Sequence, residues 1–281
     1  MSVAIVTDST ASLHAGDAAR MGIEVVPLQV VIGADTFTES LDATPAMIAT
    51  ALASFVPVST SRPSPERFLA AYERLAAAGA TSVVSVHLSS RISGTLESAA
   101  LAARRSPVPV VVVDSTQVGI ATGFAATRAA QARDRGEDAA RVAEAARRAG
   151  ERSTTLLYVD SLEYLRRGGR VGGAAALIGS ALAVKPLLTV ADGLVVPLER
   201  VRTSARAVAR LQVLACRQAG RHPQGVDVGV QHLANAAVAH SVAERLAEVL
   251  GQGRIRVDEV GAVIGAHVGP GMVAVTLTPR D

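Results

Sequence analysis

Short apolar runs rich in β-branched residues alternate along this sequence with longer, alanine-rich segments whose apolar residues recur at helical spacing. The runs that predict strands cover residues 3–7, 24–31, 82–87, 108–113, 155–159, 226–232 and 254–260. The segments that predict helices cover residues 65–78, 94–105, 122–135, 138–150, 204–220 and 236–250. Because strands that alternate with helices form parallel sheets with helices on their faces, the pattern predicts an α/β fold.

The second half of the chain carries a different signal. Asp192-Gly193 lies between the apolar runs 184–190 and 194–198, and an Asp-Gly pair in this setting predicts a β-hairpin. A hairpin makes two neighbouring strands antiparallel, so we expect a mixed sheet here and a mainly parallel sheet in the first half. The long charged segment 133–152 precedes the expected boundary, which gives an N-terminal α/β domain over residues 1–154 and a C-terminal α/β domain over residues 155–281.

Aliphatic residues dominate the expected core. The chain is 49% hydrophobic but only 2% aromatic, so a ligand pocket is expected to be aliphatic, which disfavours base stacking. The 28 basic and 25 acidic residues give a net charge of +3, too small to indicate nucleic-acid binding by itself. The lone cysteine, Cys216, excludes an intrachain disulfide, and the histidines lack metal-ligand spacing. We therefore expect no metal and no cofactor.

The N-terminal residues predict a first strand and not a signal peptide, because no basic stretch precedes their apolar run and Asp8 follows at once. The longest uncharged stretch, between Arg170 and Lys185, is shorter than the roughly 20 residues that a membrane span needs. A cytoplasmic protein without a membrane span is expected.

Small polar residues gather at several expected strand ends and helix starts, where free helix N–H groups can meet an anion. Thr7-Asp8-Ser9-Thr10 follows the first strand and either caps a helix or reaches into a cleft; the sequence leaves both open. Thr60 and Ser61 lie too far from Ser64, the expected N-cap, to share its role. Their hydroxyls are therefore candidates for binding a ligand.

The segment from Ser89 to Thr95 is the strongest candidate for an anion site. It joins a strand to a helix, and Gly94 allows the backbone to approach a ligand closely. Ser93 and Thr95 supply hydroxyls, and the helix start supplies N–H donors. Helix capping alone explains Thr95, but it does not require so many small polar residues in the segment.

Two further candidates lie in glycine-rich segments. Arg170 is flanked by glycines in a pattern that matches neither a Walker A loop nor a dinucleotide fingerprint, and its guanidinium can reach a phosphate or carboxylate. Residues 174–188 follow it with small apolar side chains suited to lining a narrow tunnel. His267 stands alone among apolar residues and glycines; such a histidine is more often structural, but the glycines favour a site.

Taken together, these segments resemble the DegV family. The resemblance runs nearly end to end, through Val6-Thr7-Asp8-Ser9-Thr10, Thr60-Ser61-Arg62-Pro63-Ser64, Ser89 to Thr95, Val113-Asp114-Ser115, Leu162-Glu163-Tyr164-Leu165, Gly168-Gly169-Arg170, Val184-Lys185-Pro186 and His267-Val268-Gly269-Pro270-Gly271. It implies a two-domain α/β fold with a long-chain fatty acid between the domains. It further implies the acyl-binding subunit of a bacterial fatty acid kinase, which is not an enzyme alone. Such a subunit presents the carboxylate to a separate ATP-binding kinase subunit and delivers the acyl-phosphate to phospholipid synthesis.

The resemblance also implies roles for individual residues. Thr60 and Ser93 match the hydroxyls that bind the carboxylate, and His267 matches their neighbour. The full expected carboxylate site is Thr60, Ser61, Ser93, Gly94, Thr95 and His267. Arg170 and Arg202 match basic residues used near the head group and with the kinase. Arg62 stands where the family more often has glutamine, which bears on the polarity of the tunnel mouth and on the choice of partner.

Two other functions remain open from the sequence. A stand-alone serine hydrolase would use Ser93 and His267, although Ser93 lacks the Gly-x-Ser-x-Gly context of a nucleophile elbow. A nucleotide- or DNA-binding regulator finds no support in any Walker A, dinucleotide or aromatic-basic motif. The expected partners are a long-chain fatty acid and the kinase subunit, without nucleic acid; transient contact with a membrane surface stays open.

Overall fold

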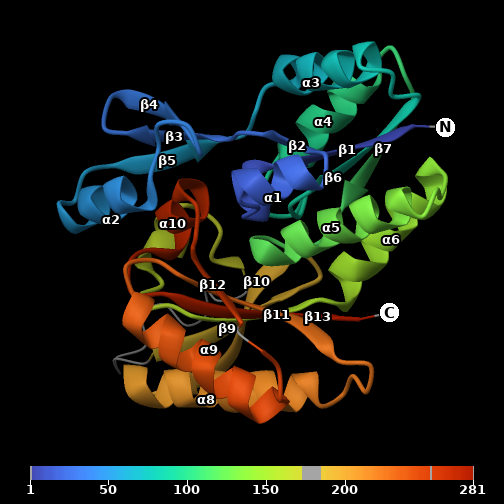
Figure 1. Cartoon of the computed structure of the whole chain (residues 1–281). Coiled ribbons are helices and arrows are strands. Elements are labelled where there is room, and N and C mark those ends of the chain that lie inside the picture. Colours follow the sequence, from blue (N-terminus) through green and yellow to red (C-terminus); the bar gives the residue numbers. More distant parts are fainter. Residues whose placement is uncertain (1, 173–184, 254, 281) are drawn as a thin grey trace.

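The computed structural model describes residues 2–172, 185–253 and 255–280, and these residues form three sheets (Figure 1). A four-stranded parallel sheet has the order β2-β1-β6-β7 and comprises β1 (Val3–Asp8), β2 (Ile23–Val26), β6 (Ser82–His87) and β7 (Val110–Asp114). A six-stranded mixed sheet has the order β10-β9-β8-β13-β11-β12. Its strands are β8 (Thr154–Tyr158), β9 (Lys185–Ala191), β10 (Leu194–Val201), β11 (Val226–His232), β12 (Arg256–Glu259) and β13 (Val273–Pro279).

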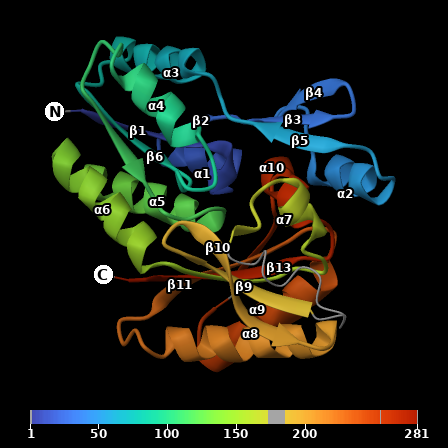
Figure 2. The same ribbon diagram turned by 180° about the vertical axis from the view of Figure 1, so that it is seen from behind.

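The third sheet is small and antiparallel. Its order is β4-β3-β5, with β3 (Gln29–Ile32), β4 (Asp35–Thr38) and β5 (Val58–Ser61). It projects from the parallel-sheet lobe together with α2 (Pro45–Ala53) and lies beside α10 (Ala262–Val268), as both views show (Figures 1 and 2).

Helices cover the two large sheets. The parallel sheet packs α3 (Pro65–Ala77) and α4 (Thr95–Ala103) on one face, and α5 (Ile120–Asp134) and α6 (Ala139–Arg152) on the other. The mixed sheet packs α8 (Ser204–Ala219) and α9 (Ala236–Leu250) on its outer face. Its inner face meets α7 (Glu163–Arg167) and α10, while η1 (Ser9–Ala11) and α1 (Ala15–Arg20) follow β1. No described helix combines the length and the hydropathy needed to cross a bilayer.

The parallel sheet, the mixed sheet and the hairpin confirm the α/β fold expected from the sequence. β9 and β10 pair antiparallel around the predicted turn, where Asp192 and Gly193 both have positive φ. The single strand predicted over residues 24–31 is wrong: β2 and β3 belong to different sheets. Pro27 lies between them and has no N–H for a ladder, so the chain changes sheets there. Most of the predicted tunnel lining at 174–188 lies outside the described residues, and the domain boundary at 154/155 stays a prediction.

A buried polar network fixes the ends of β1 and β6. The carboxylate of Asp8 accepts hydrogen bonds from the backbone N–H and hydroxyl of Thr10, from the N–H of Leu88 at 3.2 Å, and from Nδ1 of His87 at 2.9 Å. His87 Nε2 lies 2.7 Å from Ser85 Oγ, which also accepts from the hydroxyl of Tyr72 at 2.9 Å. With Nδ1 of His87 protonated, every bond has one donor: Tyr72 donates to Ser85, Ser85 donates to His87, and His87 donates to Asp8.

The network predicts an order of stability among variants. Tyr72→Phe removes one terminal donor, so it should lower the free energy of unfolding by about 1 kcal/mol. Ser85→Ala removes a smaller group but leaves two buried polar atoms unpaired, the Tyr72 hydroxyl and His87 Nε2, so it should cost roughly 2–4 kcal/mol. Urea unfolding of both variants measures this; a Tyr72→Phe variant less stable than Ser85→Ala would contradict the network.

Candidate functional site

A cavity of about 430 Å³ lies between the parallel-sheet lobe and the inner face of the mixed sheet. Its volume is within the range usual for small-molecule sites. Most of its lining is aliphatic, and the described lining has no aromatic side chain. The apolar members are Leu28, Leu88, Ile92, Val118, Leu157, Leu165, Val190, Val195, Val260, Val263, Ile264, Val268, Met272 and Ala274. Such a surface suits an extended hydrocarbon.

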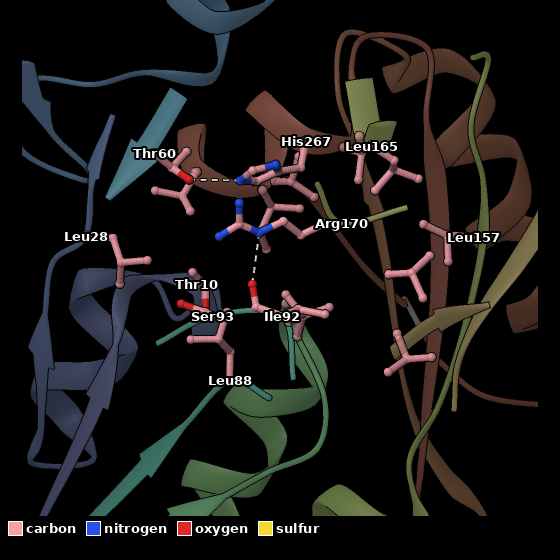
Figure 3. A pocket seen from close by; sticks show the side chains of 18 of the residues that line it. Thr10, Leu28, Thr60, Leu88, Ile92, Ser93, Leu157, Leu165, Arg170 and His267 are labelled. Carbon is pink, nitrogen blue, oxygen red and sulfur yellow. Dashed lines mark hydrogen bonds between the residues drawn. The ribbon is translucent and has the colours of Figure 1, made fainter. Parts of the chain in front are cut away.

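Polar side chains gather in one part of this cavity (Figure 3). Thr60 comes from β5, Ser93 from the loop before α4, Arg170 from the segment after α7, and His267 from the last turn of α10. The Arg170 guanidinium lies between the Thr60–His267 pair and the Ile92–Ser93 backbone. The fold therefore brings together four polar residues from distant parts of the sequence.

Thr60 and His267 form a neutral pair. The Thr60 Oγ1 atom lies 2.9 Å from His267 Nε2. Burial, together with the smaller effect of the nearby positive charge of Arg170, lowers the pKa of His267 to about 4. His267 Nδ1 is buried and has no hydrogen-bond partner among the described residues. At neutral pH this corner thus offers a hydroxyl and an uncharged ring.

Arg170 supplies the positive charge of the site. Its Nε donates to the carbonyl of Ile92 at 3.0 Å, and its Nη1 donates to the carbonyl of Gly168 at 2.6 Å. In the part of the chain that the structure describes, no carboxylate pairs with it. Two neutral acceptors hold the guanidinium in place, so its charge remains available to an anion.

The other expected site residues divide into two groups. Ser61 and Gly94 also line the cavity, but Arg62 lies over Gly94, donates to its carbonyl at 3.2 Å and pairs with Glu97. A Cβ at position 94 would lie 2.3 Å from Arg62 Nη1, so this glycine makes room for a side chain of the same protein. The sequence predicted that a ligand would approach the backbone closely at Gly94; in the structure the side chain of Arg62 makes this approach.

Thr95 and Arg202 lie outside the cavity lining. Thr95 is buried, and its Oγ1 lies 2.9 Å from Ser93 Oγ, so this hydrogen bond orients the Ser93 hydroxyl. Arg202 is exposed on the connection between β10 and α8. The segment Thr7-Asp8-Ser9-Thr10, for which the sequence left two roles open, has both: Asp8 caps η1 by accepting the N–H of Thr10, and Thr10 lines the cavity.

Three polar residues were not singled out in the sequence. Thr155 and Gln231 line the cavity from β8 and β11, and Glu39 is buried beneath α10. Thr155 and Gln231 sit within runs that predict strands, and Glu39 lies in a short polar segment. Nothing in the local pattern distinguishes them from ordinary strand or loop residues.

The arrangement lacks the contacts of a serine hydrolase. Ser93 bonds to Thr95, and His267 bonds to Thr60, so no hydrogen bond joins Ser93 to His267. No described carboxylate orients the other ring nitrogen of His267. A nucleophile, a base and an orienting group are therefore not aligned.

The lowered pKa of His267 predicts a pH-dependent stability. Between its ordinary value of 6.5 and about 4, the unfolded chain protonates this ring while the folded protein does not. The contribution of His267 to the free energy of unfolding is therefore fully present above pH 6.5 and is lost, by up to about 3 kcal/mol, as the pH falls toward 4. Urea unfolding at about pH 7.5 and about pH 5 measures the loss, which His267→Asn should reduce. A His267 ring that titrates near 6.5 by NMR would contradict this prediction.

Comparisons with known proteins agree with the fold. The model of the DegV family, described as an uncharacterised protein family, matches residues 2–280. A DegV domain-containing protein of Streptomyces coelicolor is 48% identical and covers 99% of both chains. One from Mycobacterium tuberculosis is 38% identical and covers 98% of this chain and 96% of its own.

Solved structures extend the agreement. A DegV family protein from Thermus thermophilus, described by its fatty acid binding, superposes with a TM-score of 0.93 at 31% identity, with both chains fully covered. DegV from Bacillus subtilis, described as a fatty acid binding protein, gives a TM-score of 0.91 at 31% identity over the full length of both chains. From the family match over nearly its whole length and the identity with these relatives, the chain belongs to the DegV family.

Proposed function

We propose that this protein binds a long-chain fatty acid in the cavity and presents its carboxylate to a separate, ATP-binding kinase subunit. The observation that carries the proposal is the polar cluster of Thr60, Ser93, Arg170 and His267 in a cavity whose described lining is mostly aliphatic. The related proteins from T. thermophilus and B. subtilis, which are described as binding fatty acids, support it. The ligand would lie between the proposed domains, residues 1–154 and 155–281.

Burial of the acyl chain would supply most of the affinity. Each buried methylene contributes about 0.8 kcal/mol, so a chain of about 16 carbons gains on the order of 10 kcal/mol before the costs of immobilisation. The aliphatic lining offers no ring stacking and no polar partner along most of its surface. The head group then has to be accommodated without undoing this gain.

The polar cluster can satisfy a buried carboxylate by hydrogen bonds. If His267 carries its proton on Nε2, it donates to Thr60 Oγ1, and the Thr60 hydroxyl proton is free to point at the ligand. Ser93 and the N–H groups that begin α4 supply further donors. A neutral histidine adds no positive charge, so the carboxylate oxygens keep their ability to attack.

In the proposed reaction, a carboxylate oxygen attacks the γ-phosphorus of ATP held by the partner. The bond from phosphorus to the leaving ADP oxygen breaks, and an acyl-phosphate forms. Arg170 would counter the charge of the incoming phosphoryl group, and exposed Arg202 would contact the partner. We place the reaction in the cytoplasm, where the partner finds ATP, and the acyl-phosphate would feed phospholipid synthesis.

The first test is the identity of the ligand. Protein purified without added lipid should release a long-chain fatty acid on denaturation, detected by mass spectrometry, and delipidated protein should bind added palmitate. A protein that neither carries a fatty acid nor binds palmitate would overturn the proposal.

The second test separates binding from phosphorylation. Arg170→Ala should bind palmitate within about threefold of the wild type but lower acyl-phosphate formation, measured with the purified kinase subunit of the same organism, by at least about 100-fold. Arg91→Ala is the matched control, because Arg91 is exposed nearby and, among the described residues, its guanidinium donates only to the carbonyl of Asp192. The control should leave both quantities unchanged. Equal loss of binding and phosphorylation in Arg170→Ala would refute this division of roles.

A further inference from the structure

Glu39 is a buried carboxylate that contacts the helix carrying His267. Its side chain follows β4 and is 2% exposed. Its Oε1 accepts the backbone N–H of Val263 at 2.7 Å, across 224 residues of sequence. Val263 lies in the first turn of α10. The carboxylate therefore reaches the N-terminal end of a helix in the other half of the chain.

The same side chain is held from the parallel-sheet lobe. Glu39 Oε2 accepts the hydroxyl of Ser9 at 2.5 Å, and Ser9 Oγ in turn accepts the N–H of Leu28 at 3.0 Å. The backbone N–H of Glu39 donates to the carbonyl of Leu28 at 2.9 Å. One carboxylate thus connects the turn after β1, the start of the three-stranded sheet and α10.

Gly261 makes this contact sterically feasible. A Cβ at this N-cap position would lie 2.3 Å from Glu39 Oε1. No side chain of α10 or its own N-cap caps the helix. A carboxylate at a helix N-terminus is stabilised by the free N–H groups and the helix dipole. Glu39 therefore does for α10 what a local capping residue does for other helices.

The position of α10 decides where His267 lies. Val263 and His267 are four residues apart, so they share one face of the helix, and both line the cavity. The helix has only seven residues, too few to hold its place through its own hydrogen bonds. Any rotation or sliding of α10 would therefore move His267 Nε2 away from Thr60.

Burial raises the pKa of Glu39, which means that ionising this carboxyl in the folded protein costs free energy. No described cation offsets that cost. The hydrogen bonds from the Ser9 hydroxyl and the Val263 N–H offset it instead. A leucine or methionine would fill the same space without the penalty, but neither could accept the N–H of Val263.

We infer that Glu39 is a positioning residue for the head-group site, which anchors the first turn of α10 and thereby holds His267 against Thr60. The inference rests on the proposed function and deepens it. Glu39 does not contact the ligand; it acts through His267.

A double-mutant cycle with palmitate tests this inference. Glu39→Ala should weaken palmitate binding about tenfold in the wild-type background. In the Thr60→Val background, where His267 has lost its partner, the same change should weaken binding by less than about twofold. Equal weakening in both backgrounds, or no weakening in the first, would overturn the inference.

Two further variants separate positioning from general loosening. Glu39→Gln keeps an oxygen for the Val263 N–H and should bind palmitate within about threefold of the wild type; a loss of tenfold or more would overturn the inference. Ser153→Ala disrupts a buried hydroxyl pair with Thr278, and neither of these residues lines the cavity, so it should lower stability without changing palmitate binding. If Glu39→Ala does not fold, Ser9→Ala replaces it, with an expected weakening of about threefold that depends on Thr60.

A measurement without ligand keeps this inference apart from the proposed function. The ¹⁵N resonances of the His267 ring should shift in delipidated Glu39→Ala and stay near their wild-type values in Glu39→Gln. Unchanged resonances in Glu39→Ala would overturn the positioning role. If the wild-type protein fails to bind palmitate, the proposed function fails, while the ring resonances still report on Glu39.

Discussion

The buried carboxylate of Asp8 is the constraint from which the walls of the cavity follow. Asp8 pairs with no lysine or arginine among the described residues, so four donors converge on it, and each comes from a segment that leads to the cavity. Thr10 lines the cavity directly, and Ser9, beside it, holds Glu39. Leu88 begins the loop to Ser93. Satisfying one charge at the end of a parallel strand thus sets the positions of several elements.

The polar cluster of the cavity likewise contains few charged groups. Thr60, Ser93 and a neutral His267 supply polarity without ionisation, and Arg170 is tied to two carbonyl groups. An ion pair with an acidic side chain would have neutralised Arg170 before any ligand arrived. Among the described residues, the cluster therefore combines neutral hydrogen-bonding groups with one guanidinium whose charge no acidic side chain neutralises.

Local sequence signals account for the parts of the fold that depend on local physics. Strand–helix alternation and the Asp192-Gly193 turn predicted the two large sheets and the hairpin, because periodicity and turn chemistry decide them. The three-stranded sheet was missed, because its strands have four residues each and Thr60 lies in a polar segment. The clustering of Thr60, Ser93, Arg170 and His267 matches the positions singled out, whereas the role of Glu39 depends on contacts across 224 residues that no local pattern carries.

Gly168 packs closely against the ring of His267 and its carbonyl accepts from Arg170, so one position contacts both basic residues of the cluster. A Cβ at 168 would lie 2.1 Å from His267 Nδ1, and Arg170 donates to the carbonyl of this same residue. Its backbone has ordinary helical angles, so space alone demands glycine here. Any side chain at this position would disturb the imidazole and the guanidinium together. A side chain at position 168 is therefore excluded as long as His267 is present, and replacing His267 with a smaller residue would have to come first.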